Sequence, residues 1–125
     1  MFRRWRRRPP EPPVIDEGYL ARLARHVGEG ALSELLADGL IEIEDRVRAL
    51  ELAAAAGDRE GALRIGHDLA GIAGHLGLAR LSWRAAEMMR AARAAPDAPA
   101  AGLAGPVAAA GREACVELAG RRVCA

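Results

Sequence analysis

From Val14 onward, apolar residues recur at intervals of three and four, which is the period of an amphipathic α-helix. No stretch shows the strict alternation of apolar and polar residues, or the β-branched enrichment, that is typical of strands. Alanine, leucine and arginine are abundant, and all three favour helix. The sequence therefore predicts an all-α protein, and its 125 residues allow one domain with one core.

Glycines, prolines and capping residues divide this pattern into segments. The expected helices are a short one that begins after Asp16, longer ones over Ala31–Ala56 and Arg59–Leu76, a fourth that carries Leu81 to Ala92, and a last one from about Pro106 to Ala119. Short connections make successive helices antiparallel neighbours. We therefore expect an antiparallel up-down four-helix bundle with a short additional N-terminal helix that covers one end.

The two ends of the chain depart from the helical pattern. Residues 1–13 contain five arginines between positions 3 and 8, followed by four prolines, and predict a disordered tail. Without those five arginines, 13 basic residues remain against 17 acidic ones, a charge of about −4, so a basic face for nucleic acid is not expected. The predicted bundle spans residues 14–119, and residues 120–125 form a C-terminal tail.

Membrane and metal functions find little support in the chain. No apolar run reaches the length of a membrane span, and prolines follow the arginines where a signal peptide needs its apolar region. We therefore expect a cytoplasmic protein that is not inserted in a membrane. Cys115 and Cys124 are too few for a disulfide framework or a zinc site, and Cys115 is expected in the core.

One histidine of the third expected helix faces away from the core. With about 100° of rotation per residue, Leu69, Ile72 and Leu76 fall within about 40° of Ile65 and form an apolar stripe. His67 lies about 200° around the helix from Ile65. The sequence therefore predicts that His67 is exposed to solvent.

Glycines in the same helix surround this histidine. Each glycine inside a helix costs about 0.8 to 1 kcal/mol relative to alanine, so their presence needs a reason. Gly61 projects toward the core and predicts close packing between helices. Gly71 and Gly74 lie beside His67, where core packing does not require them. They predict a bare surface on which the loops of a partner can approach the imidazole.

Two small or apolar residues flank His67 on the expected helix. Leu63 and Ala70 lie at about 160° and 140° on the helical wheel that places Ile65 at zero. They predict a small apolar patch suited to docking a partner helix. The alternative is a poorly packed, alanine-rich surface with no binding role.

The stretch around His67 resembles the motif of the histidine-containing phosphotransfer (HPt) family. That motif is histidine, any residue, leucine, lysine, glycine, any residue, a small residue, two further positions, leucine and glycine. The matching residues are His67, Leu69, Gly71, Ala73, Leu76 and Gly77. The resemblance covers about Ile15 to Ala94 and implies a four-helix bundle in which His67 is the phosphorylated residue.

The resemblance also implies the partners of the reaction. His67 would accept a phosphoryl group from a receiver-domain aspartate, as in a hybrid histidine kinase, and pass it to the receiver domain of a response regulator. A histidine in water is mostly uncharged at neutral pH, so an exposed one can attack without a separate base. The receiver would bring the Mg²⁺, so no cofactor or metal of the chain's own is expected.

The chain departs from the family at one position that matters for charge. The family's lysine, three residues after the histidine, is replaced by Ala70. Arg64, one turn before His67, could supply the charge, and Arg84 on the next helix is a second candidate. The residues expected to stabilise the phosphoryl group or contact the partner are Leu63, Arg64, Asp68, Ala70, Gly71 and Gly74.

Other functions remain open at this point. The chain has no lysine and no glycine-rich nucleotide loop, so kinase activity is not expected. Ala70 keeps open a module that docks a response regulator without being phosphorylated. Asp68 directly after His67 is typical of the dimeric bundle of histidine kinases, although the proline and second domain of such kinases are missing. We expect a monomer, with His75 as a surface residue too far along the helix to share a metal.

Overall fold

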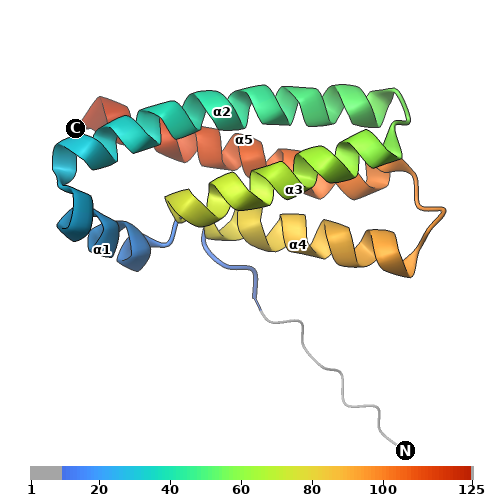
Figure 1. The fold of residues 1–125 in the computed structure, drawn as a ribbon, viewed down its shortest axis with the longest axis horizontal. Helices are drawn as coiled ribbons and strands as arrows, with labels where there is room; N and C mark the ends of the chain where they lie inside the picture. Colours follow the sequence, from blue (N-terminus) through green and yellow to red (C-terminus); the bar gives the residue numbers. More distant parts are fainter. Residues whose placement is uncertain (1–9, 125) are drawn as a thin grey trace, which may run out of the picture.

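The computed structural model describes residues 10–124, and within that range it contains five helices and no strand. The helices are α1 (Glu17–Val27), α2 (Glu29–Ala55), α3 (Arg59–Leu76), α4 (Ala79–Ala94) and α5 (Ala100–Cys124). The all-α prediction is therefore confirmed. Figure 1 shows α2, α3, α4 and α5 lying lengthwise beside one another, with the short α1 at one end. No helix of residues 10–124 is long and apolar enough to cross a membrane.

The four long helices share one apolar core. α2 packs against α3 and α5, and α4 also packs against α3 and α5. The largest fully buried side chains come from all four of these helices or the turns between them: Ile43, Leu50, Leu69, Leu78, Leu81, Val107 and Leu118. Burying a side chain of this size stabilises the folded state by about 1.5 to 3 kcal/mol. No polar side chain is buried within the described part of the chain.

The third helix begins and ends at the residues that the sequence predicted. The carboxylate of Asp58 accepts a hydrogen bond of 2.9 Å from the backbone N–H of Gly61, which caps the start of α3. At the other end Gly77 adopts a left-handed backbone with φ of 68°, where a side chain would be strained and would overlap Tyr19. The helix that carries His67 therefore has a fixed length of 18 residues.

The last helix is longer than predicted at both ends. α5 begins at Ala100, so the prediction that Pro106 lies in its first turn was wrong. Ala100 and Leu103 are buried in the core, and this packing offsets the cost of proline inside a helix, which is about 3 kcal/mol. α5 also continues through residues 120–124, which we expected to form a tail. At the start of α2, the helix includes two residues before Ala31.

A single arginine joins the beginning of α3 to the end of α4. The guanidinium of Arg59 donates hydrogen bonds to the carbonyl oxygens of Ala92 at 2.8 Å, Ala95 at 3.1 Å and Ala98 at 3.1 Å. These carbonyls lie at the end of a helix or beyond it, where no intrahelical donor is available. Arg59 thereby orders the connection between α4 and α5.

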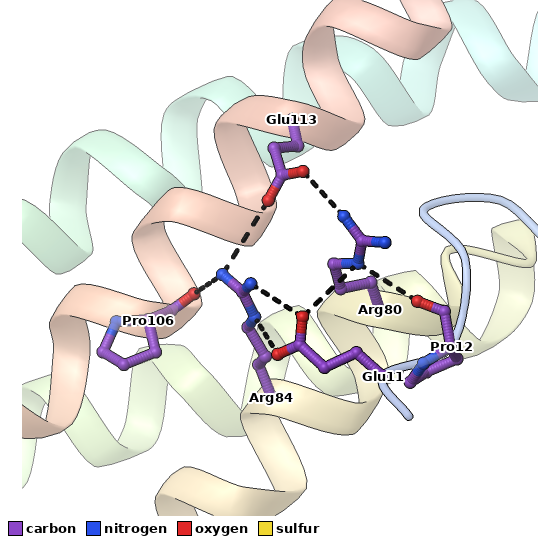
Figure 2. A network of polar contacts seen from close by, with 6 residues as sticks. All are labelled: Glu11, Pro12, Arg80, Arg84, Pro106 and Glu113. Carbon is purple, nitrogen blue, oxygen red and sulfur yellow. Dashed lines mark hydrogen bonds and ion pairs between the residues drawn. The ribbon is translucent and has the colours of Figure 1, made fainter. Parts of the chain in front are cut away.

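The segment before α1 lies against α4 (Figure 2). The backbone N–H of Arg80 donates to the carbonyl of Pro13 at 3.0 Å, and its Nε donates to the carbonyl of Pro12 at 3.1 Å. Residues 10–13 therefore differ from the disordered tail in which the sequence analysis placed them. The arginine-rich residues 1–9 lie outside the described residues, and their disorder stays a prediction.

Four charged side chains connect this segment with α4 and α5 (Figure 2). Arg84 donates to both carboxylate oxygens of Glu11, at 2.9 Å and 3.0 Å, and to the carbonyl of Pro106 at 3.0 Å. Arg80 donates to Glu113 at 2.8 Å. The hydrogen bond from Arg84 lowers the pKa of Glu11, and the same bond raises the pKa of Arg84.

Candidate functional site

His67 lies on the solvent side of α3. The buried residues of this helix are Gly61, Ala62, Gly66, Leu69, Ala73 and Leu76. His67 is exposed, as are Gly71 and Gly74 on the same side. The prediction that the imidazole faces away from the core is confirmed.

The buried face of α3 is rotated relative to the predicted apolar stripe. Ile65 and Ile72, which we placed at the centre of that stripe, are only half-buried, whereas Ala62 and Ala73 are buried. The middle of the buried face therefore lies about 45° around the helix from Ile65. His67 still lies about 155° from that middle, so the rotation leaves it exposed.

The glycines of α3 fall into two groups. A Cβ added to Gly71 or Gly74 would meet no atom within 4 Å, so neither glycine is required by packing. In contrast, a Cβ at Gly66 would overlap the terminal methyl of Met88 from α4. A Cβ at Gly61 would overlap the carboxylate of Asp58. Gly61 is buried, as predicted, and the atoms nearest to such a Cβ belong to the cap of its own helix.

A shallow, open depression lies between α2 and α3 beside the histidine. It is lined by Glu42 and Arg46 of α2 and by His67, Asp68, Gly71, Ile72 and His75 of α3. The Nε atom of Arg46 lies 4.0 Å from a carboxylate oxygen of Asp68, and the two side chains are 46% and 48% exposed. Ion pairs that are this exposed contribute about 0 to 1 kcal/mol, so the pairing leaves Arg46 free to exchange partners.

Arg46 was missed by the sequence analysis. Its apolar neighbours on α2 predict a helix, but the pattern does not indicate which face of α2 meets α3. Only the packing of the two helices brings Arg46 to the depression that contains His67. No pattern in the sequence would have singled it out from the other arginines of the chain.

The two arginines that the sequence suggested do not line the depression. Arg64 is exposed and does not line the depression, and its side chain makes no hydrogen bond or ion pair to another side chain of the described residues. The guanidinium of Arg84 donates hydrogen bonds to Glu11, in the segment before α1, and to the carbonyl of Pro106 in α5. Neither arginine is placed beside His67 by the contacts that the structure describes.

The residues predicted to form an apolar patch are only partly available. Leu63 and Ala70 are half-buried and pack against the core. They therefore offer less apolar surface to a partner than fully exposed side chains would. The depression beside His67 is lined mostly by charged and imidazole side chains, together with Gly71 and Ile72.

His75 shares the depression with His67, two turns further along α3. It is exposed, and its backbone carbonyl accepts a hydrogen bond of 2.9 Å from the hydroxyl of Tyr19 in α1. Within residues 10–124, no group of three or more histidine, cysteine, aspartate or glutamate side chains is placed to hold a metal ion. The depression presents the exposed imidazoles of His67 and His75 with the guanidinium of Arg46 nearby.

Fold and site together define a helical bundle that presents a histidine to solvent beside bare helical backbone. Residues 34–119, more than half of the chain, match the family described as Hpt domain, so the protein belongs to this family. Hpt domains serve histidine phosphotransfer in two-component signalling and interact with receiver domains. Neither the comparison with curated proteins nor that with solved structures gives a match.

Proposed function

We propose that the protein is a phosphorelay intermediate in which His67 carries the phosphoryl group. It would take this group from the receiver-domain aspartate of a hybrid histidine kinase and pass it to the receiver domain of a response regulator. The observation that supports this most is the exposed imidazole beside two glycines that packing does not require. Membership of the Hpt family supports the same role.

The chemistry is a transfer between two nucleophiles. The ring nitrogen of His67 that carries no proton attacks the phosphorus of the aspartyl phosphate. The new N–P bond forms as the P–O bond breaks, and the aspartate leaves as a carboxylate. The other ring nitrogen then releases its proton to water. Because transfer depends on in-line placement and charge stabilisation, the receiver and its Mg²⁺ can supply most of what is needed.

The arrangement of the bundle forms part of this proposal. We infer that α2 to α5 run in alternating directions, because each is joined to the next by a short connection: residues 56–58 between α2 and α3, 77–78 between α3 and α4, and 95–99 between α4 and α5. Connections this short allow only antiparallel neighbours. We also propose that the protein acts as a monomer in the cytoplasm, where receiver domains operate.

A second function is favoured by one observation. Ala70 occupies the position of the family's lysine, and the nearest guanidinium in the depression, that of Arg46, is paired with Asp68. A chain of this kind could dock a response regulator and regulate it without carrying phosphate. Docking and phosphoryl transfer would use the same exposed face, so only a direct test of phosphorylation separates them.

The test is to incubate the protein with radiolabelled, phosphorylated receiver domains and to follow acid-labile label. The wild type and the control His26→Gln, which changes an exposed histidine of α1, should both become labelled. His67→Gln should remain unlabelled. Label that persists on His67→Gln would refute the role of His67. Receivers that bind all three proteins but label none would support the docking module.

A further inference from the structure

The depression beside His67 is acidic before any phosphate arrives. Glu42 and Asp68 contribute two negative charges, and Arg46 contributes one positive charge. A phosphoryl group on His67 would add about two more negative charges. Such a group would be repelled by both carboxylates unless a cation moved to it. Among the residues lining the depression, Arg46 is the side chain that always carries a positive charge.

The direction of side chains on a helix disfavours Arg64 for this role. Every Cα–Cβ bond of an α-helix tilts toward the helix N-terminus. A long side chain that precedes His67 by one turn therefore leans away from the imidazole, whereas one that follows it leans back over it. Ala70 follows His67 but carries no charge. A cation that this chain supplies to His67 is therefore better placed on another helix.

We propose that Arg46 binds the phosphoryl group on His67 and exchanges its contact with Asp68 for the phosphoryl oxygens. This inference rests on the proposed function of His67. The contact of 4.0 Å between Arg46 and Asp68 is long, and both side chains are half-exposed. The guanidinium fork matches the spacing of phosphoryl oxygens, and its hydrogen bonds to them are charge-assisted.

The position of Arg46 on α2 is fixed by its neighbours. Ile43 and Val47 are buried in the core, so α2 cannot rotate about its axis without exposing them. The Cα of Arg46 therefore stays at the edge of the depression while its flexible side chain moves. Binding of the phosphoryl group needs a change of side-chain rotamer only, which exposed residues make in nanoseconds or less.

The test compares two arginines of the same helix. Arg46→Ala removes the proposed phosphoryl contact, and Arg46→Lys keeps a positive charge. The matched control is Arg48→Ala, because Arg48 is also exposed on α2 but lines a different hollow, which faces α5. Thermal unfolding of all three variants shows whether the fold is retained. Arg46 and Arg48 are both exposed, so we expect no loss of the folded state.

Two phosphoryl donors separate this inference from the proposed relay. The first is a phosphorylated receiver domain. The second is phosphoramidate, from which ammonia leaves as the N–P bond to histidine forms, so no protein partner is involved. Label on His67→Gln is subtracted in both assays to remove the contribution of other histidines. The rate of phosphorylation at His67 is measured for each variant and each donor.

With both donors, Arg46→Ala should be phosphorylated about tenfold more slowly than the wild type, as expected for the loss of a charge-assisted hydrogen bond. Arg46→Lys should regain part of the rate, and Arg48→Ala should match the wild type. Equal rates for Arg46→Ala and the wild type would overturn the inference, and so would equal losses in both alanine variants. A wild type that accepts from phosphoramidate in an Arg46-dependent way, but from no receiver, would refute the relay alone. A wild type that accepts from neither donor would refute both.

Discussion

At the scale of single residues, Gly71 and Gly111 show two different reasons for a glycine inside a helix. A Cβ at Gly71 would meet open space beside His67. A Cβ at Gly111 would overlap a methyl group of Val47, where α5 packs against α2. The first glycine leaves a surface bare, and the second lets two helices approach closely.

We expect Gly71→Ala to raise the free energy of unfolding by about 0.8 to 1 kcal/mol, because alanine restricts the unfolded chain and meets no obstacle in the fold. Gly111→Ala should lower it by about 1 to 3 kcal/mol through overpacking. Urea denaturation of both variants measures the difference. A loss of stability in Gly71→Ala would show that the space beside His67 is not open.

The same position tests whether bare backbone matters for function. Gly71→Leu places a bulky side chain one turn after His67, and this side chain would lean back over the imidazole. Transfer from a phosphorylated receiver should then fall by about tenfold or more, although the helix remains stable. Phosphorylation by phosphoramidate, a much smaller donor, should fall less. Equal transfer rates for Gly71→Leu and the wild type would show that a receiver does not need bare backbone at this position.

Cys115 provides a test of burial on α5. Its thiol is half-buried rather than fully in the core as predicted, and burial, with a smaller contribution from Glu44, raises its pKa to about 11. In a Cys124→Ser background, alkylation of Cys115 should be slow near neutral pH and should accelerate as pH rises toward that value. Because the folded pKa is raised, the stability contributed by the neutral thiol should be lost as pH rises through about 11. An alkylation rate that levels off below the ordinary thiol pKa of 9.0 would contradict this.

At the scale of elements, the start of α3 depends on one capping residue. Asp58→Ala removes the acceptor for the N–H of Gly61 and should lower the free energy of unfolding by about 1 kcal/mol. Asp58→Asn keeps an acceptor and should lose less. Chemical denaturation of both variants provides the measurement. Equal losses would indicate that the negative charge near the helix N-terminus, and not the hydrogen bond, is what stabilises α3.

The same elements show what the sequence could and could not predict. The bounds of α3 were predictable because Asp58 and Gly77 are strong local signals at its two ends. The start of α5 was not, because burial of Ala100 and Leu103 overrides the local preference of Pro106. Tertiary packing therefore determines where α5 begins, and the helical pattern of this segment alone does not show that packing.

The candidate site was also predictable only in part. The exposure of His67 and the open space at Gly71 followed from helical geometry alone. The buried face of α3 was misplaced because its alanines and glycines carry almost no hydrophobic signal. Arg46 was missed because it approaches from another helix. Local periodicity therefore predicts the residues that α3 contributes to the site but not those that α2 contributes.

At the scale of the whole molecule, the segment before α1 is attached through Glu11. The hydrogen bond from Arg84 lowers the pKa of the Glu11 carboxyl group, so this pKa is lower in the folded than in the unfolded state. The stability from this contact is present above the unfolded pKa and is lost as pH falls through the folded pKa. Glu11→Gln should therefore be slightly less stable than the wild type at neutral pH, and this difference should disappear in acid. Thermal unfolding across that pH range would show it. A constant difference at every pH would indicate that packing, and not charge, holds the segment.

The oligomeric state separates two of the functions left open by the sequence. A chain of 13.2 kDa that measures as a monomer by light scattering supports the phosphotransfer module. A mass twice as large would favour the dimeric bundle typical of histidine kinases. The large exposed apolar side chains of residues 10–124 are distributed over α1, α2 and α5 and do not include residues of α3. We therefore expect the monomer.

The helix that carries His67 is secured at both ends. Asp58 caps its beginning, and at its end the hydroxyl of Tyr19 and the backbone N–H of Asp16 donate to the carbonyls of His75 and Gly77. The imidazole is thus mounted on a stiff support that has little freedom left to lose. A receiver that docks there meets a helix backbone already in its final position, so α3 contributes little to the entropy cost of binding.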